Sequence, residues 1–164
     1  MFKSYPYVSQ FKAYLFAFIF LFGFSASLSA NEEQVKELLT LKAAPVGVVF
    51  EVVSWDEAYL KTALDNFEKY QAQLKAKFPE IGLAVVTHGN EQFSLTEDNS
   101  KKYQATHKQV QRITETKVPV HICAGHARMR AIDTSTFPDY VSVSRSGPAE
   151  IRNYQALGYT LIIL

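Results

Sequence analysis

The chain contains one cysteine, Cys123, within the segment VPVHICAGHAR at residues 118–128. A cysteine thiolate is a nucleophile, and a nearby cation or a helix N-terminus favours it over the thiol. His126 and Arg128 follow closely and supply candidate positive charge, and a helix that begins at Ala124 would direct its positive end toward the sulfur. The opposing interpretation is an inert buried thiol, because cysteine is among the residue types most often found in protein interiors. The sequence leaves both interpretations open.

Other chemistries fit this segment less well. The Cys-x-Gly-x-x-Arg spacing is only partly similar to a rhodanese loop, and the arginine comes five positions after the cysteine rather than the six of a phosphatase loop. His121, Cys123 and His126 offer three metal ligands at most, whereas a structural zinc site takes four. No glycine-rich phosphate loop is present. We therefore expect neither a metal nor a cofactor.

The elements that position Cys123 alternate between strand and helix patterns. Buried-strand patterns cover residues 46–53, 81–89, 118–123, 140–144 and 159–164. Helical patterns cover residues 54–78, 101–117 and 147–158. Residues 91–99 have the composition of a loop. The alternation predicts an α/β sandwich with a mostly parallel, five-stranded sheet.

The ends of the predicted helices carry their own signals. Ser54, with Glu57 three residues later, has the spacing of a capping box and predicts a helix start at Ser54. Gly158 fits the position just past the end of the last helix. The polar composition of residues 101–117 predicts a surface helix on which His107 is solvated.

Candidate site residues gather where the predicted strands end. In parallel sheets, ligands bind beyond the carboxyl ends of the strands. His88 and Asn90 come at the end of the second predicted strand, and Cys123 ends the third, followed by His126 and Arg128. We expect a site at this edge in which Cys123 is the nucleophile and the other four residues bind substrate or supply charge.

Residues 1–30 have the three-part organisation of a secretory signal peptide. Two lysines precede the apolar run Ala13–Phe24, and the small-residue tract SASLSA follows it. The run is shorter than the roughly 20 residues that cross a bilayer. We predict cleavage after Ala30 or slightly upstream and export to the periplasm; the alternative is an uncleaved anchor formed by residues 13–30.

The rest of the chain has the size of a single domain. Loss of the two leader lysines lowers the formal net charge from +1 to −1, and no run of like charge indicates a nucleic-acid partner. A single cysteine excludes a disulfide scaffold. We assign residues 31–44 to a linker or short helix and residues 45–164 to the folded domain.

Three segments of this domain resemble the DsrE/DsrF-like family. Thr87-His88-Gly89 and Cys123 each end a strand, and residues 146–159 read SGPAEIRNYQALGY, like the terminal segment of that family. The resemblance spans residues 45–164. It implies a flavodoxin-like three-layer sandwich that assembles into trimers or hexamers. Cytoplasmic members of the family carry sulfur as a cysteine persulfide, which implies the same role for Cys123. The sequence Cys-Ala-Gly-His at 123–126 departs from the Cys-x-Asn-Thr pattern of secreted members.

Two functions follow from these observations. The first is a periplasmic sulfur carrier or sulfur transferase that holds sulfane sulfur as a persulfide on Cys123. Its partners would be small sulfur species or a thiol-bearing protein. The second is a non-catalytic, oligomeric binding or assembly module in which the cysteine is buried and inert.

Overall fold

The structure, a computed structural model, describes residues 30–164. The predicted signal peptide, like its alternative as an anchor, falls outside these residues except for Ala30, which is the first residue of helix α1 (Ala30–Thr40). The segment assigned to a linker or short helix is therefore mostly helical. Between residues 30 and 164, no helix is long and apolar enough to cross a membrane.

Five strands form one sheet in the order β4-β3-β2-β1-β5, and every neighbouring pair is parallel. The strands are β1 (Gly47–Val52), β2 (Gly82–Thr87), β3 (Val120–Cys123), β4 (Ser142–Ser144) and β5 (Tyr159–Ile163). The helices that follow α1 are α2 (Tyr59–Lys77), α3 (Gln104–Glu115), α4 (Ala124–Met129) and α5 (Gly147–Ala156). Short 3₁₀ helices are η1 (Asn90–Leu95), η2 (Glu97–Asn99) and η3 (Thr134–Thr136). The predicted α/β class is confirmed, and the sheet is wholly parallel.

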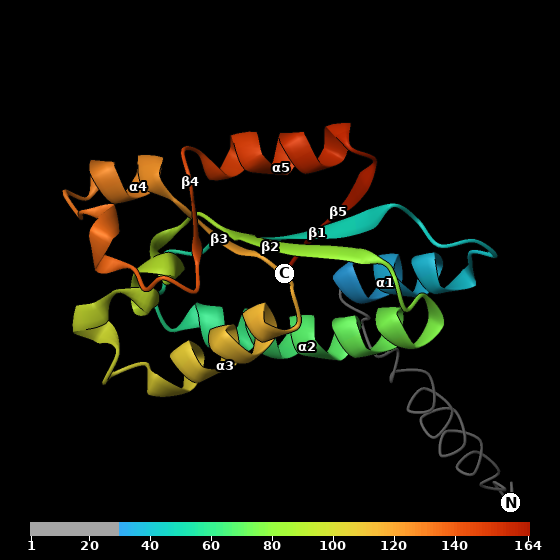
Figure 1. The fold of residues 1–164 in the computed structure, drawn as a ribbon, viewed down its shortest axis with the longest axis horizontal. Helices are drawn as coiled ribbons and strands as arrows, with labels where there is room; N and C mark the ends of the chain where they lie inside the picture. The colour runs from blue at the N-terminus through green and yellow to red at the C-terminus, as the bar shows by residue number, and fades with distance from the viewer. Residues whose placement is uncertain (1–29) are drawn as a thin grey trace, which may run out of the picture.

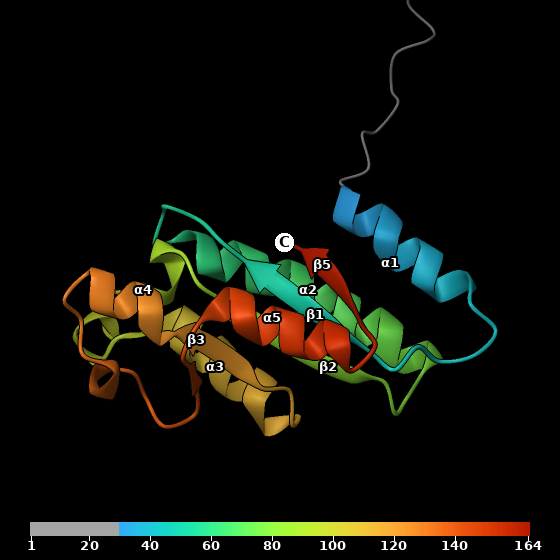
Figure 2. The same cartoon turned by 90° about the horizontal axis from the view of Figure 1, so that it is seen from above.

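Helices cover both faces of the sheet. The longer helices α2 and α3 lie on one face with α1 beside them, and α4 and α5 lie on the other (Figure 1). Seen from above, α5 crosses the sheet as the main cover of its face (Figure 2). These are the three layers that the resemblance implied.

The two faces bury very different amounts of apolar surface. On the α2 side, alternate residues of β1, such as Val48 and Phe50, belong to one large core in which the Phe50 ring meets Phe67 edge to face at 5.1 Å. Burial of one such aromatic side chain contributes roughly 1.5–3 kcal/mol. The α5 side holds only a small cluster that includes Val49 and Ile151. Most of the hydrophobic stabilisation therefore lies on the α2 side.

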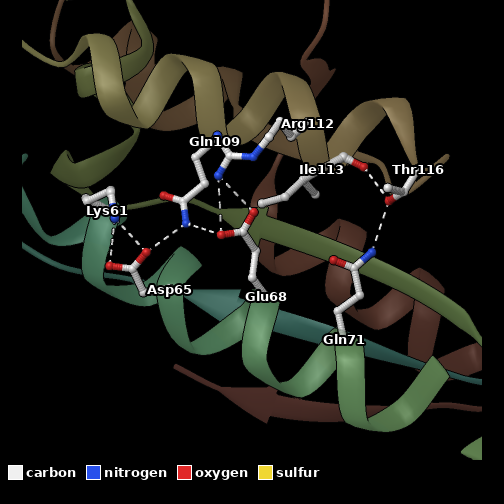
Figure 3. A network of polar contacts seen from close by, with 8 residues as sticks. All are labelled: Lys61, Asp65, Glu68, Gln71, Gln109, Arg112, Ile113 and Thr116. Atoms are coloured by element: carbon white, nitrogen blue, oxygen red, sulfur yellow. Dashed lines mark hydrogen bonds and ion pairs between the residues drawn. The ribbon is translucent and has the colours of Figure 1, made fainter. Parts of the chain in front are cut away.

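Polar contacts join α2 to α3 (Figure 3). Gln109 Nε2 donates to Asp65 Oδ1 at 2.9 Å and to Glu68 Oε2 at 2.7 Å, and Arg112 pairs with Glu68 at 3.1 Å. A hydrogen bond from Lys61 is the main reason why the pKa of Asp65 lies below its usual value. Exposed ion pairs contribute only about 0–1 kcal/mol each. The buried amide nitrogen of Gln109 bonds two carboxylates of α2 at once and adds to the apolar contacts that α3 makes with the core through Val110 and Ile113.

Helix α2 begins at Tyr59, later than the start predicted at Ser54. Ser54 Oγ accepts a hydrogen bond from the backbone N–H of Asp56 at 3.1 Å, and the Asp56 carboxylate accepts one from the residue two positions further on. The side chain of Glu57 instead accepts a hydrogen bond from a tyrosine at the start of α3. The predicted capping box is therefore wrong, because Ser54 and Asp56 close two successive turns ahead of the helix.

The segment between β2 and α3 is also more ordered than predicted. Residues 91–99 form η1 and η2, and most of η1 is buried. His107, predicted to be solvated, is buried: its Nε2 lies 3.0 Å from the carbonyl oxygen of Ser94 and its Nδ1 lies 2.5 Å from Tyr140 Oη. The prediction for His107 was wrong because η1 and the segment before β4 pack over α3. The polar sequence of α3 alone does not indicate these contacts.

Candidate functional site

The chain changes sides at the carboxyl edge of the sheet. It leaves β1 and β2 toward the face of α2 and α3, and it leaves β3 and β4 toward the face of α4 and α5 (Figure 1). In open parallel sheets a binding crevice forms where neighbouring connections diverge in this way. His88 directly follows β2 and Cys123 ends β3, so both lie at this point.

Cys123 is the last residue of β3 and the N-cap of α4. Its backbone N–H donates to Gln92 Oε1 at 2.7 Å, and its Sγ accepts a hydrogen bond from the backbone N–H of His126 at 3.3 Å. A donor directed at the sulfur stabilises negative charge on it. The residue is only 5% exposed. The thiol is thus shielded from bulk solvent but held in a fixed orientation.

Cys123 borders a cavity of about 370 Å³, called here the Cys123 pocket. Its other lining residues are His88, Gly125, His126, Met129, Ser146 and Pro148. They come from the end of β2, from α4 and from the start of α5. A volume of this size is typical of small-molecule sites. The thiol and the two histidines that the sequence placed at this edge share one pocket.

His88 is held by a carboxylate and by a helix. Its Nε2 lies 2.7 Å from Glu51 Oε1, and both side chains are largely buried. A carboxylate accepts, so Nε2 carries a proton and Nδ1 is the nitrogen left to exchange one. On the other side, a Cβ at Gly147 would lie 2.5 Å from the Cβ of His88, so only glycine lets the start of α5 approach this closely.

The ring of His126 is also held by a hydrogen bond, here with Asn90. Its Nε2 lies 3.0 Å from Asn90 Oδ1, while Asn90 Nδ2 donates to the carbonyl oxygen of Trp55 at 3.2 Å. The second bond sets which way the Asn90 amide faces, so His126 Nε2 is a donor and Nδ1 is free to accept. The ring stacks on Phe93 at a centroid distance of 5.3 Å. Burial is the main cause that lowers the pKa of His126, against an opposing effect of Glu91, and the imidazole is neutral at pH 7.

Glu91 fastens the loop after β1 to the loop after β2. Its Oε2 accepts the backbone N–H of Ser54 at 2.7 Å. Its Oε1 accepts the hydroxyl of Thr87 at 2.5 Å and the backbone N–H groups of His88 and Gly89 at 3.1 and 2.9 Å. The carboxylate is fully buried, and these four donors offset the cost of its desolvation. Glu91 therefore sets the backbone positions of two loops that shape the site.

Arg128 and His121 do not join this pocket. Arg128 is exposed on α4 and does not line the Cys123 pocket. His121 shares a sheet face with Cys123, but its ring nitrogens contact Ser144 Oγ at 3.0 Å and Tyr154 Oη at 2.9 Å. Burial lowers the pKa of His121, which is neutral at pH 7. Among residues 30–164, no three His, Cys, Asp or Glu side chains are grouped so as to hold a metal ion.

Sequence reasoning missed Glu51, Glu91 and Gln92. Glu51 is the only charged residue in the apolar run at 46–53, and that signal could have indicated it. Glu91 and Gln92 lie in the segment interpreted as a loop, where no pattern indicates that their side chains are buried.

The strand order, the wholly parallel sheet and the pocket at its carboxyl edge define a flavodoxin-like α/β sandwich. Among solved structures, the chain is similar to protein MTH1491 from Methanobacterium thermoautotrophicum, described as being of unknown function, with a TM-score of 0.58 and 21% identity over 71% of this chain and 97% of that one. It is also similar to the YchN protein of E. coli, with a TM-score of 0.52 and 14% identity over 72% of this chain and 99% of that one. No family model and no curated protein matches the sequence. The likeness to DsrE/YchN-like structures is one of fold.

Proposed function

We propose that this chain is a DsrE-like sulfur carrier or sulfur transferase in which Cys123 accepts sulfane sulfur as a persulfide. The observation that carries the proposal is the pocket that Cys123 shares with His88 and His126. The shared fold with YchN supports it, as does the family-like segment at 146–159, which forms α5 and the turn into β5.

The proposed reaction assigns roles to Cys123 and His88 that are compatible with their hydrogen bonds. His88 takes the thiol proton on Nδ1, the ring nitrogen that the contact with Glu51 leaves free. The Cys123 thiolate then attacks the outer sulfur of a persulfide R–S–SH, the S–S bond breaks, and the leaving R–S⁻ takes the proton back from His88. The products are the Cys123 persulfide and R–SH, so the step needs no oxidant or reductant. Attack by an acceptor thiol on the outer sulfur regenerates Cys123 in the same way.

Mass spectrometry of the intact protein tests this proposal. After incubation with inorganic polysulfide, the native protein should gain one sulfur atom, which a reducing agent removes. The Cys123→Ser variant should gain none. A native protein that remains unmodified while the urea-unfolded chain reacts would refute the proposal.

The low exposure of Cys123 favours a second candidate function, a binding or assembly module with an inert thiol. A thiol probe at neutral pH separates the two candidates. A reactive Cys123 should combine with the probe in the folded protein at a rate comparable to that of the unfolded chain. An inert Cys123 should react only at the rate at which the domain unfolds.

The proposal includes export to the periplasm and assembly into a trimer or hexamer, both motivated by the sequence. Cell fractionation followed by N-terminal sequencing should find a processed chain that begins near Ala30. Light scattering on that chain should return a multiple of the monomer mass, and a monomer mass would remove the assembly from the proposal.

A further inference from the structure

A second cavity adjoins the candidate site. It has a volume of about 340 Å³ and is called here the Trp55 pocket. Its lining residues are Val53, Ser54, Trp55, His88, Gly89 and His126. None of them is Asp, Glu, Lys or Arg, and both histidines that line it are fixed by the contacts described above. The walls are therefore suited to an uncharged organic group rather than to an ion.

The two pockets have His88 and His126 in common. A molecule that places a sulfur atom beside Cys123 can therefore extend across these two imidazoles to Trp55. Asn90 links the two sides, since its side-chain amide contacts both the Trp55 carbonyl and His126. The Trp55 pocket therefore borders the candidate site at these two imidazoles.

The apolar side chains of this pocket are unusually exposed. Trp55 is 85% and Val53 is 50% exposed. Large aromatic side chains gain most when a ligand covers them, through burial and ring stacking. The cavity volume is within the range of small-molecule sites, and a sulfane sulfur alone would occupy little of the two pockets together.

We propose that the Trp55 pocket holds the organic substituent of a low-molecular-weight persulfide whose outer sulfur is transferred to Cys123. The inference rests on the proposed function and names its substrate class: organic persulfides R–S–SH in which R is apolar or aromatic. Cys123 Sγ forms a bond to the outer sulfur, and the bond between the two sulfurs of R–S–SH breaks. The thiolate R–S⁻ leaves with the electron pair, is protonated by His88 and departs as R–SH from the Trp55 pocket.

Transfer kinetics with two donors test the specificity. With benzyl persulfide, Trp55→Ala should lower the second-order rate constant of Cys123 persulfidation by roughly three- to tenfold, the loss of one aromatic contact. With inorganic polysulfide, the same variant should react as the native protein does. Leu157→Ala removes an equally apolar, 67% exposed side chain at the far end of α5 and is the matched control for both donors. An equal loss with both donors would overturn the inference while leaving the proposed function standing.

A binding measurement keeps the inference testable even if Cys123 transfers no sulfur. Trp55 is the only tryptophan in the chain, so its emission reports on this pocket alone. In the Cys123→Ser variant, benzyl mercaptan should shift the emission to shorter wavelength and protect it from quenching by acrylamide. Unchanged emission at millimolar thiol would overturn the inference. The inference would also be overturned if Trp55 were shielded from acrylamide without any thiol and this shielding increased with protein concentration. A second copy of the chain would then cover the pocket.

Discussion

Replacement of the buried Glu91 by glutamine should destabilise the domain far more than the same replacement at an exposed glutamate. In Glu91→Gln, the amide oxygen can still accept the three bonds now made by Oε1, but the amide nitrogen faces the N–H of Ser54 in place of Oε2. A bond to a charged acceptor contributes about 1.5–3 kcal/mol and a neutral one about 1 kcal/mol, and an unpaired buried donor costs about 1–3 kcal/mol. We therefore expect a loss of about 2–4 kcal/mol in the free energy of unfolding, or roughly 10 °C in Tm.

Urea unfolding followed by far-UV circular dichroism measures this loss. Glu97→Gln, a few residues along at an exposed position in η2, is the matched control and should change stability by less than about 0.5 kcal/mol. A change of the same small size in Glu91→Gln would show that the four bonds to Glu91 do not stabilise the loops around the site.

Two further predictions concern the titrating groups. Glu51→Gln should slow the reaction of Cys123 with a thiol probe by roughly tenfold, because His88 loses the carboxylate that orients its ring. An unchanged rate would exclude His88 as the base. Three histidines have pKa values that burial lowers from 6.5 (His107, His121 and His126). Below pH 6.5 the unfolded chain binds protons that the folded chain does not, so stability should rise with pH up to about 6.5 and fall as the pH drops below it. Urea midpoints at pH 5.5 and 7.5 check this trend, which should weaken in His107→Gln.

The fold could be predicted from sequence because it depends on local patterns. The run VGVVFEVV at 46–53 is apolar on both faces, which suits a strand covered by helices on both sides. The same patterns also predicted that Cys123 and His88 lie at one edge of the sheet, since parallel strands bring their carboxyl ends together. The start of α2 was predicted wrongly because the backbone N–H of Ser54 is bound by Glu91, a contact between residues 37 positions apart.

The contact between Glu51 and His88 could be predicted only from the order of the strands in the sheet. The sequence patterns do not indicate that order. Glu51 pairs in register with Val86 on β2, two residues before His88, so its side chain is on the same face and next to the imidazole. Once β1 and β2 are known to be neighbours, the alternation of side chains predicts this contact. Arg128 is exposed on α4 and lines neither the Cys123 pocket nor the Trp55 pocket.

The position of β5 at the edge of the sheet has a consequence for the thiol. Glu51 pairs with Ile163 on β5, and its carbonyl oxygen accepts a hydrogen bond from the backbone N–H of Leu164 at 2.9 Å. The carboxylate that orients His88 thus stands on a strand flanked by the last residues of the chain. Displacing this strand would remove one of the two strands that hold β1, and would thereby disturb how Glu51 orients His88 in the wall of the Cys123 pocket.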